Sequence, residues 1–272
     1  RQVWIFKLLD YCRSINAGRD VEATAVAYFQ RYFLDNPYTG VDLLAFSRTC
    51  IFLATKTCES RRAARAFDVP AEAILALEPL LLHGLHYELQ WHHPYIALEG
   101  FLLKWREFAT EQDSKKPRRS REPVAPPISP EDIASIAALA AEKLHLLLYT
   151  DYPILCSPAQ LALGALQCAG EEQANKESAS GSSSSSSSSG TASDYPPQRS
   201  LRAFILKLAQ NDANAVKGIV QVWKNLQTGL RGVHPRKRFQ DISTKSSFRE
   251  LQTILTGIQQ DQAPPIKKQR TT

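Results

Sequence analysis

Two charged residues, Lys56 and Glu78, interrupt apolar helical patterns in the first part of this 272-residue chain. Lys56 lies in the sequence ATKTCES, and Glu78 lies in ILALEPLLLHGLHYEL. An ammonium group donates hydrogen bonds and a carboxylate accepts them, but either charge is costly in an apolar face unless a partner meets it. The two positions therefore indicate a surface that binds another protein.

Both charges fall within predicted helices. Apolar residues recur at steps of three and four residues from Thr39 to Thr57 and again from Ala71 to Leu89, which favours helices over strands. Lys56 lies one turn after Phe52, and Glu78 lies between two apolar turns, so both border the apolar rows. An alternative remains open, in which both are rim residues of an ordinary helical bundle.

The same periodicity divides the chain into two sets of five helices. The first set is predicted at about 3–17, 21–34, 41–57, 61–67 and 71–87. The second is predicted at about 95–108, 131–148, 158–168, 201–210 and 213–230, and one further helix at 247–260. Ser129 and Pro130 place a cap and a first-turn proline in the expected order before one of them.

Two stretches interrupt the second set. Residues 113–127 are basic and proline-rich, and residues 171–197 contain eight consecutive serines. Such compositions bury too little apolar area to offset the entropy lost on ordering. We expect disordered insertions near 113–128 and 171–198, which a closed fold tolerates because loop entropy grows only logarithmically with length.

The third helix of each set is rich in small residues, which allow neighbouring helices to approach from several sides. This is what a central helix surrounded by four others requires. The predicted fold is therefore all-α, with two tandem five-helix bundles and a C-terminal helix.

The composition excludes several classes of protein. No apolar run reaches the roughly 18 residues of a membrane helix, and the start of the chain lacks the pattern of a signal peptide, so we expect a soluble intracellular protein. Five widely spaced cysteines without a C-x-x-C pair predict reduced thiols. The histidines have no carboxylate or cysteine to complete a metal set, so we expect no metal and no cofactor. The chain contains no methionine, which favours a piece of a longer protein.

The basic residues concentrate outside the predicted helices. The formal charge is +6, but twelve lysines and arginines lie in 115–121, 231–238 and 267–270, and without them the charge would be −6. The predicted body is therefore acidic, which argues against direct nucleic-acid binding. The terminal sequence PPIKKQR fits a nuclear import signal.

Four stretches together resemble the cyclin family, and within it cyclin H. They are VEATAVAYFQRYFLDN, TCIFLATKTCE, LEPLLLHGLHYELQWHHPYIALEGFL and DYPILCSPAQLALGAL, in this order across nearly the whole chain. The resemblance implies two cyclin boxes, at 1–90 and 91–232, followed by a basic linker, a C-terminal helix and a tail at 233–272. The helix that precedes the first box in cyclin H has no counterpart in this sequence.

The resemblance also implies a function. In cyclins a lysine and a glutamate at the positions of Lys56 and Glu78 hold the activation helix of a cyclin-dependent kinase, and the apolar wall around them would comprise Leu53, Leu82, Tyr87 and Leu89. The implied protein is a non-enzymatic kinase activator in the nucleus, part of the complex that activates other kinases and phosphorylates the tail of RNA polymerase II. Its implied partners are that kinase, a third assembly subunit and general transcription factor H.

The sequence departs from the cyclin pattern in three places. Pro79 directly follows Glu78 and removes an amide hydrogen bond, Cys58 stands where cyclins usually carry an acidic residue, and the preceding helix is missing.

Two alternative functions remain open. One alternative is a transcriptional cyclin of the C or L type. The other is a cyclin-box transcription-initiation adaptor that binds DNA, which would need basic residues on a folded face. The chain lacks a phosphate-binding glycine loop and a nucleophile motif, so we expect no catalytic residue.

Overall fold

The computed structural model describes residues 2–60, 71–115, 129–180 and 195–209, with the isolated residues 221, 224, 225, 227 and 228. All regular secondary structure in these residues is helical, as the sequence predicts. Contacts divide the chain into two compact units, with a boundary between Leu89 and Gln90. Each unit has its own core of buried apolar side chains.

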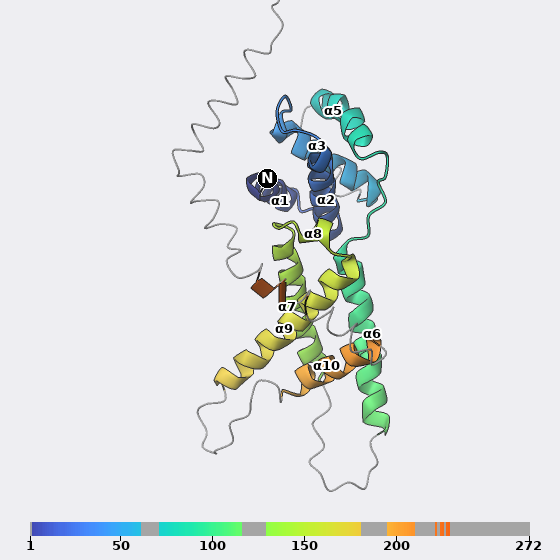
Figure 1. The fold of residues 1–272 in the computed structure, drawn as a ribbon, viewed down its shortest axis with the longest axis vertical. Coiled ribbons are helices and arrows are strands. Elements are labelled where there is room, and N and C mark those ends of the chain that lie inside the picture. The colour runs from blue at the N-terminus through green and yellow to red at the C-terminus, as the bar shows by residue number, and fades with distance from the viewer. Residues whose placement is uncertain are drawn as a thin grey trace, which may run out of the picture. The chain divides into compact units, whose positions relative to one another are not determined.

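The first unit is organised around one helix. Its described helices are α1 (Gln2–Ser14), α2 (Arg19–Asp35), α3 (Leu43–Thr57) and α5 (Ala71–Gly84). The helix α3 contacts the other three (Figure 1). Its small residues Ser47, Thr49, Cys50 and Ala54 are buried, so its neighbours can approach closely, as expected for a central helix. Helix α5 lies against α3 and has a smaller contact with α2.

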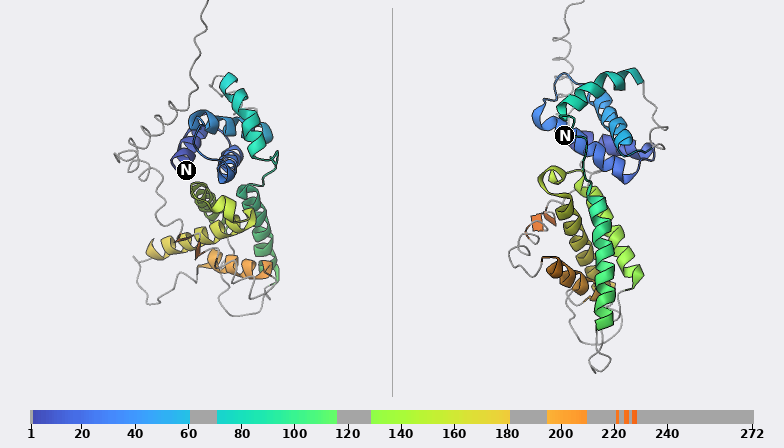
Figure 2. Two further views of the ribbon diagram at one scale, coloured as in Figure 1. Left: turned by 45° about the horizontal axis from the view of Figure 1, so that its top comes forward. Right: turned by 90° about the vertical axis from the view of Figure 1, so that its right-hand side faces the viewer.

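The second unit has a similar centre. Its described helices are α6 (Pro94–Lys115), α7 (Pro130–Leu147), α8 (Tyr152–Leu155), α9 (Pro158–Ser180) and α10 (Pro196–Leu208). Helix α9 contacts each of the others in this unit (Figure 2). A Cβ atom at Gly170 would clash with Oε1 of Gln198 and lie 3.0 Å from a methyl carbon of Leu201, so α10 approaches α9 closely at this glycine.

The structure corrects the predicted insertions. Helix α9 continues through Ser180, and α6 continues through Lys115, so 171–180 and 113–115 are helical and not disordered. The polar end of α9 is held by packing and charge. Ala174 is fully buried, and Glu172 accepts hydrogen bonds from Lys143 of α7 and Lys176 of its own helix, at 2.5 and 2.9 Å. Composition alone does not reveal these cross-helix partners.

Several predicted helix boundaries agree with the structure within a few residues. Ser129 and Asp132 form a reciprocal capping box at the start of α7, as the Ser129–Pro130 signal predicts. The short helix α8 was not predicted, because four residues carry no periodicity. The predicted helices at 61–67 and 247–260, most of the one at 213–230, and the serine tract lie outside the described residues.

The five cysteines are free thiols: Cys12, Cys50 and Cys168 are buried, and Cys58 and Cys156 are partly exposed. This agrees with the prediction of unpaired cysteines. Burial raises the pKa of the Cys50 and Cys58 thiols, so both are held in the protonated, weakly nucleophilic form.

Candidate functional site on α3 and α5

Lys56 lies in the last turn of α3, whose two ends are both well defined. Asp42 caps the helix, since its carboxylate accepts from the amides of Leu44 at 2.9 Å and Ala45 at 3.3 Å. At the other end the amide of Ser60 donates to the carbonyl of Thr55 at 2.9 Å. This bond closes a Schellman-type turn through Glu59, whose φ is 52°. Lys56 therefore sits where the helix dipole favours a cation.

Helix α5 remains continuous through Pro79. Proline has no amide hydrogen, so the carbonyl of Leu75 loses its usual helical partner. Both residues lie on the exposed side of α5, where water can hydrate that carbonyl. Although Pro79 removes this amide hydrogen bond, the side chain of Glu78 points toward α3.

The two charges meet each other. Nζ of Lys56 lies 2.5 Å from Oε1 of Glu78, and the ammonium also lies 5.0 Å from the ring centroid of Phe52. The lysine side chain is 51% exposed, whereas the glutamate side chain is only 13% exposed. The sequence pattern treats them as two lone charges, and the structure joins them in one ion pair across α3 and α5.

The residues predicted around this pair differ in accessibility. Tyr87 is 68% exposed, Leu82 and Leu89 are half-buried, and Leu53 is 3% exposed. Leu53 therefore belongs to the core beneath the pair, and only a small part of it could reach a partner. The other three remain available at or near the surface.

Sequence reasoning missed one apolar contributor and two polar ones. Leu75 is 57% exposed, and it shares a face of α5 with Glu78 and Leu82, which follow it by three and seven residues. Tyr28 and Arg31 of α2 hydrogen-bond to the segment after α5. The i, i+3 spacing of an aromatic and a basic residue was the available signal, but it also fits an ordinary amphipathic helix.

The described part of the chain offers little for other kinds of site. No group of three or more His, Cys, Asp or Glu side chains in it is placed to hold a metal ion. None of its helices combines the length and the apolar character that crossing a bilayer would require.

Comparison with known proteins identifies relatives by sequence. Cyclin-H1-1 of Arabidopsis thaliana is 28% identical over 167 residues, covering 60% of this chain and 46% of the relative. Cyclin-H of Xenopus laevis is 30% identical over 186 residues, covering 63% of this chain and 52% of the relative. No protein-family model matches the chain.

Solved structures agree in fold. The CAK complex from Chaetomium thermophilum bound to ATP-gamma-S contains a chain that matches with a TM-score of 0.66 at 18% identity, covering all of this chain and 80% of that one. A chain of the yeast TFIIK (Kin28/Ccl1/Tfb3) complex matches with a TM-score of 0.59 at 19% identity, covering 84% of each. The present chain is similar in sequence to cyclins of the H type, and it shares the fold of the CAK and TFIIK chains. It spans about half the length of these two curated cyclins.

The similarity to cyclins bears on the pair on α3 and α5. In the resemblance described above, these two positions are the ones through which cyclins hold a kinase. The pair lies within the segments that carry that resemblance, and both residues come from helices of one compact unit.

Proposed function

We propose that this chain is a cyclin H-like regulatory subunit that binds and activates a cyclin-dependent kinase and contributes no catalytic residue. The observation that carries the proposal is the Lys56–Glu78 pair, formed at the surface where α3 and α5 meet. The sequence relatives and the fold of the CAK and TFIIK chains support it.

The proposed contact works by differential binding. A kinase of this class needs a glutamate on a mobile helix to pair with its catalytic lysine. A cyclin that binds the inward position of this helix better than the outward one shifts the equilibrium toward the active form. Lys56 has N–H donors for backbone carbonyls, and Glu78 has a second oxygen for backbone amides. Leu75, Leu82 and Tyr87 would cover the apolar side of the same segment.

The ion pair in the unbound chain matters for this mechanism. Glu78 is mostly buried and Lys56 is half exposed. The ammonium of Lys56 therefore compensates the charge of Glu78 until a partner binds. On binding, the ammonium turns toward the kinase segment while the glutamate accepts new donors. Pairing therefore keeps the surface preorganised without an uncompensated buried charge.

The domain layout and wider assembly are part of the same proposal. Residues 1–90 and 91–232 would each form a five-helix cyclin box, and 233–272 a basic linker, a C-terminal helix and a tail. The kinase, a third assembly subunit and transcription factor H would be the partners, by analogy with the three-component yeast TFIIK complex. We place the protein in the nucleus and assign it no direct contact with nucleic acid.

Affinity purification followed by kinase assay tests the proposal. Tagged wild-type chain and a Lys56→Gln/Glu78→Gln variant are expressed in the source cells, recovered and analysed by mass spectrometry. We expect one cyclin-dependent kinase with the wild-type chain and a depleted amount with the variant. The kinase, purified alone, should gain activity on addition of the wild-type chain. A chain that recovers no kinase, or leaves the purified kinase inactive, contradicts the proposal.

A further inference from the structure

The chain takes an unusual backbone conformation immediately after α5. His86 and Tyr87 have φ values of 54° and 60°, in the left-handed region that side chains other than glycine seldom occupy. Two such residues in succession carry backbone strain, which persists only where surrounding contacts fix the conformation. Tyr87 lies in this turn with its side chain 68% exposed.

Local backbone bonds account for part of the turn. The amide of Tyr87 donates to the carbonyl of Leu82 at 3.0 Å, and the amide of Glu88 donates to the carbonyl of Leu85 at 3.0 Å. These bonds continue the C-terminal turn of α5. They do not hold the segment against the rest of the unit, so another element must do so.

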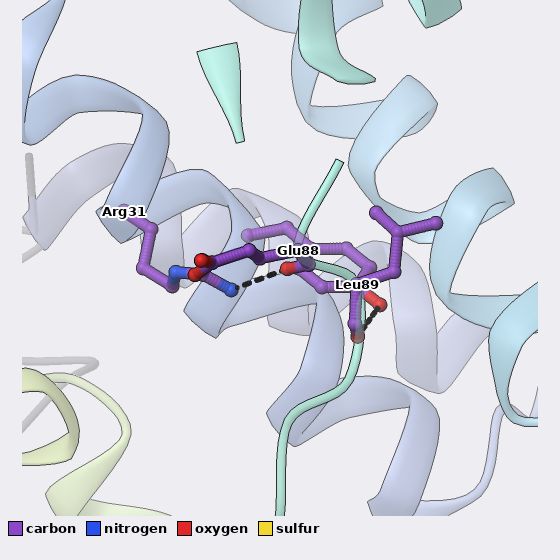
Figure 3. A network of polar contacts seen from close by, with 4 residues as sticks. Arg31, Glu88 and Leu89 are labelled. Carbon is purple, nitrogen blue, oxygen red and sulfur yellow. Dashed lines mark hydrogen bonds and ion pairs between the residues drawn. The ribbon is translucent and has the colours of Figure 1, made fainter. Parts of the chain in front are cut away.

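That element is α2. Nη1 of Arg31 donates to the backbone carbonyl of Glu88 at 2.8 Å, and Nη2 lies 3.4 Å from the carboxylate of the same residue (Figure 3). The hydroxyl of Tyr28 donates to the carbonyl of Leu89 at 2.7 Å. Two side chains of one helix thus hold two consecutive backbone carbonyls directly after Tyr87. We call Tyr28 and Arg31 the α2 latch.

The latch also reaches the helix that carries Lys56. The hydroxyl oxygen of Tyr28 lies 3.2 Å from the hydroxyl oxygen of Thr57, the residue that follows Lys56 and ends α3. Burial raises the pKa of the Tyr28 phenol, so it remains a neutral hydrogen-bond donor at physiological pH. One side chain therefore contacts both the end of α3 and the segment after α5.

We propose that Tyr28 and Arg31 are positioning residues, which fix the turn at His86–Tyr87 so that Tyr87 is presented to the kinase together with the Lys56–Glu78 pair. This inference rests on the proposed function. It assigns to α2, which contributes neither charge of the pair, the task of ordering one edge of the contact surface before the kinase binds.

The first test examines the unbound chain by amide hydrogen exchange with mass-spectrometric readout. Tyr28→Phe removes only the hydroxyl, and Arg31→Ala removes the guanidinium. Each variant should raise exchange in peptides covering 85–90 by roughly 2- to 12-fold, the range expected for one hydrogen bond. Tyr152→Phe and Arg202→Ala are matched controls, since their side chains bond to Asn225 and Glu171 in the other unit. Unchanged exchange at 85–90 in both latch variants would overturn the proposal.

The second test asks whether the latch acts through Tyr87. Affinity for the purified kinase is measured for Tyr28→Phe, Tyr87→Ala and the double variant, in a mutant cycle that includes the wild-type chain. We expect Tyr28→Phe to weaken binding several-fold in the wild-type background and to have almost no further effect beside Tyr87→Ala. An equal loss in both backgrounds would show that the latch serves stability alone. A wild-type chain that binds no kinase would instead contradict the proposed function, and with it the latch's role in binding.

Discussion

Lys56 and Glu78, 22 residues apart in the sequence, form an ion pair across α3 and α5 in which the lysine side chain is four times as exposed as the glutamate, at 51% against 13%. The pair is therefore unequal. Removal of the lysine leaves a mostly buried carboxylate without its cation, whereas neutralisation of the glutamate leaves an ammonium that water can reach.

This inequality predicts different effects of the two single variants on folding. Lys56→Ala should lower the free energy of unfolding by about 1 kcal/mol, because it leaves Glu78 unpaired. Glu78→Gln should lower it by less than about 0.5 kcal/mol, because the amide oxygen can still accept from Lys56 and the ammonium is half exposed to water. Urea denaturation of both variants beside the wild-type chain checks this order, and a greater loss for Glu78→Gln would contradict the geometry.

Substitution by alanine should have opposite effects on stability at two glycines. A Cβ atom at Gly84, the last residue of α5, would lie 2.4 Å from the ring of the buried Tyr32, while a Cβ atom at Gly100 in α6 would meet nothing within 4 Å. Gly84→Ala should therefore destabilise the protein by about 1 to 3 kcal/mol through overpacking. Gly100→Ala should stabilise it by up to about 1 kcal/mol. Thermal unfolding distinguishes the two, and equal shifts would refute the predicted close approach of α5 to α2.

The cap of α3 lies at the opposite end of the helix from Lys56, so it offers a way to separate stability from binding. Asp42→Ala should cost about 1 kcal/mol of stability, because two helix amides lose their acceptor. Kinase affinity at a temperature where the variant is folded should remain that of the wild-type chain. Asp35→Ala, which removes an exposed carboxylate at the end of α2, is the control. A fall in affinity for Asp42→Ala alone would show that the whole helix, and not its last turn, sets the site.

The charge cluster at the polar end of α9 predicts a pH dependence. Hydrogen bonds from Lys143 and Lys176 lower the pKa of Glu172 from its ordinary value of 4.5, although partial burial opposes them. A carboxyl with a lowered folded-state pKa stabilises the fold above pH 4.5, and this contribution is lost as the pH falls through the lowered value. Glu172→Gln should therefore destabilise the protein at pH 6 and matter less near pH 3. Denaturation at both pH values checks the sign, with Glu111→Gln as a control for the loss of one charge.

Much of the helical architecture could be predicted from the sequence, because local patterns determine it. The periodic apolar rows indicated α1, α2 and α3 to within a few residues, and Ser129 with Pro130 indicated the start of α7. The end of α9 could not be predicted, since Glu172 and Ala174 are stabilised by partners on another helix or by burial. A polar composition is equally typical of a loop and of a helix whose charges find such partners.

The candidate site was only half predictable for the same reason. Spacing placed Lys56 and Glu78 at the edges of two apolar rows, but it could not show that the two rows face each other and that the charges pair. The exposure of Tyr87 depends on the left-handed turn at 86–87 and on contacts from Tyr28 and Arg31, which are more than fifty residues away in the sequence. Leu53 was expected in the contact wall, and its depth in the core became evident only from the packing of α3.

The affinity of the purified kinase for the Lys56→Gln and Glu78→Gln chains, measured by titration calorimetry beside the wild-type chain, tests the central claim most directly. Lys207→Gln is the matched control, because Lys207 forms an exposed ion pair of the other unit, 3.4 Å from Glu111. We predict that each site variant weakens binding at least about tenfold, a difference of 1.4 kcal/mol or more, while the control binds like the wild-type chain. Site variants that remain folded and bind within about twofold of the wild-type chain would contradict the account.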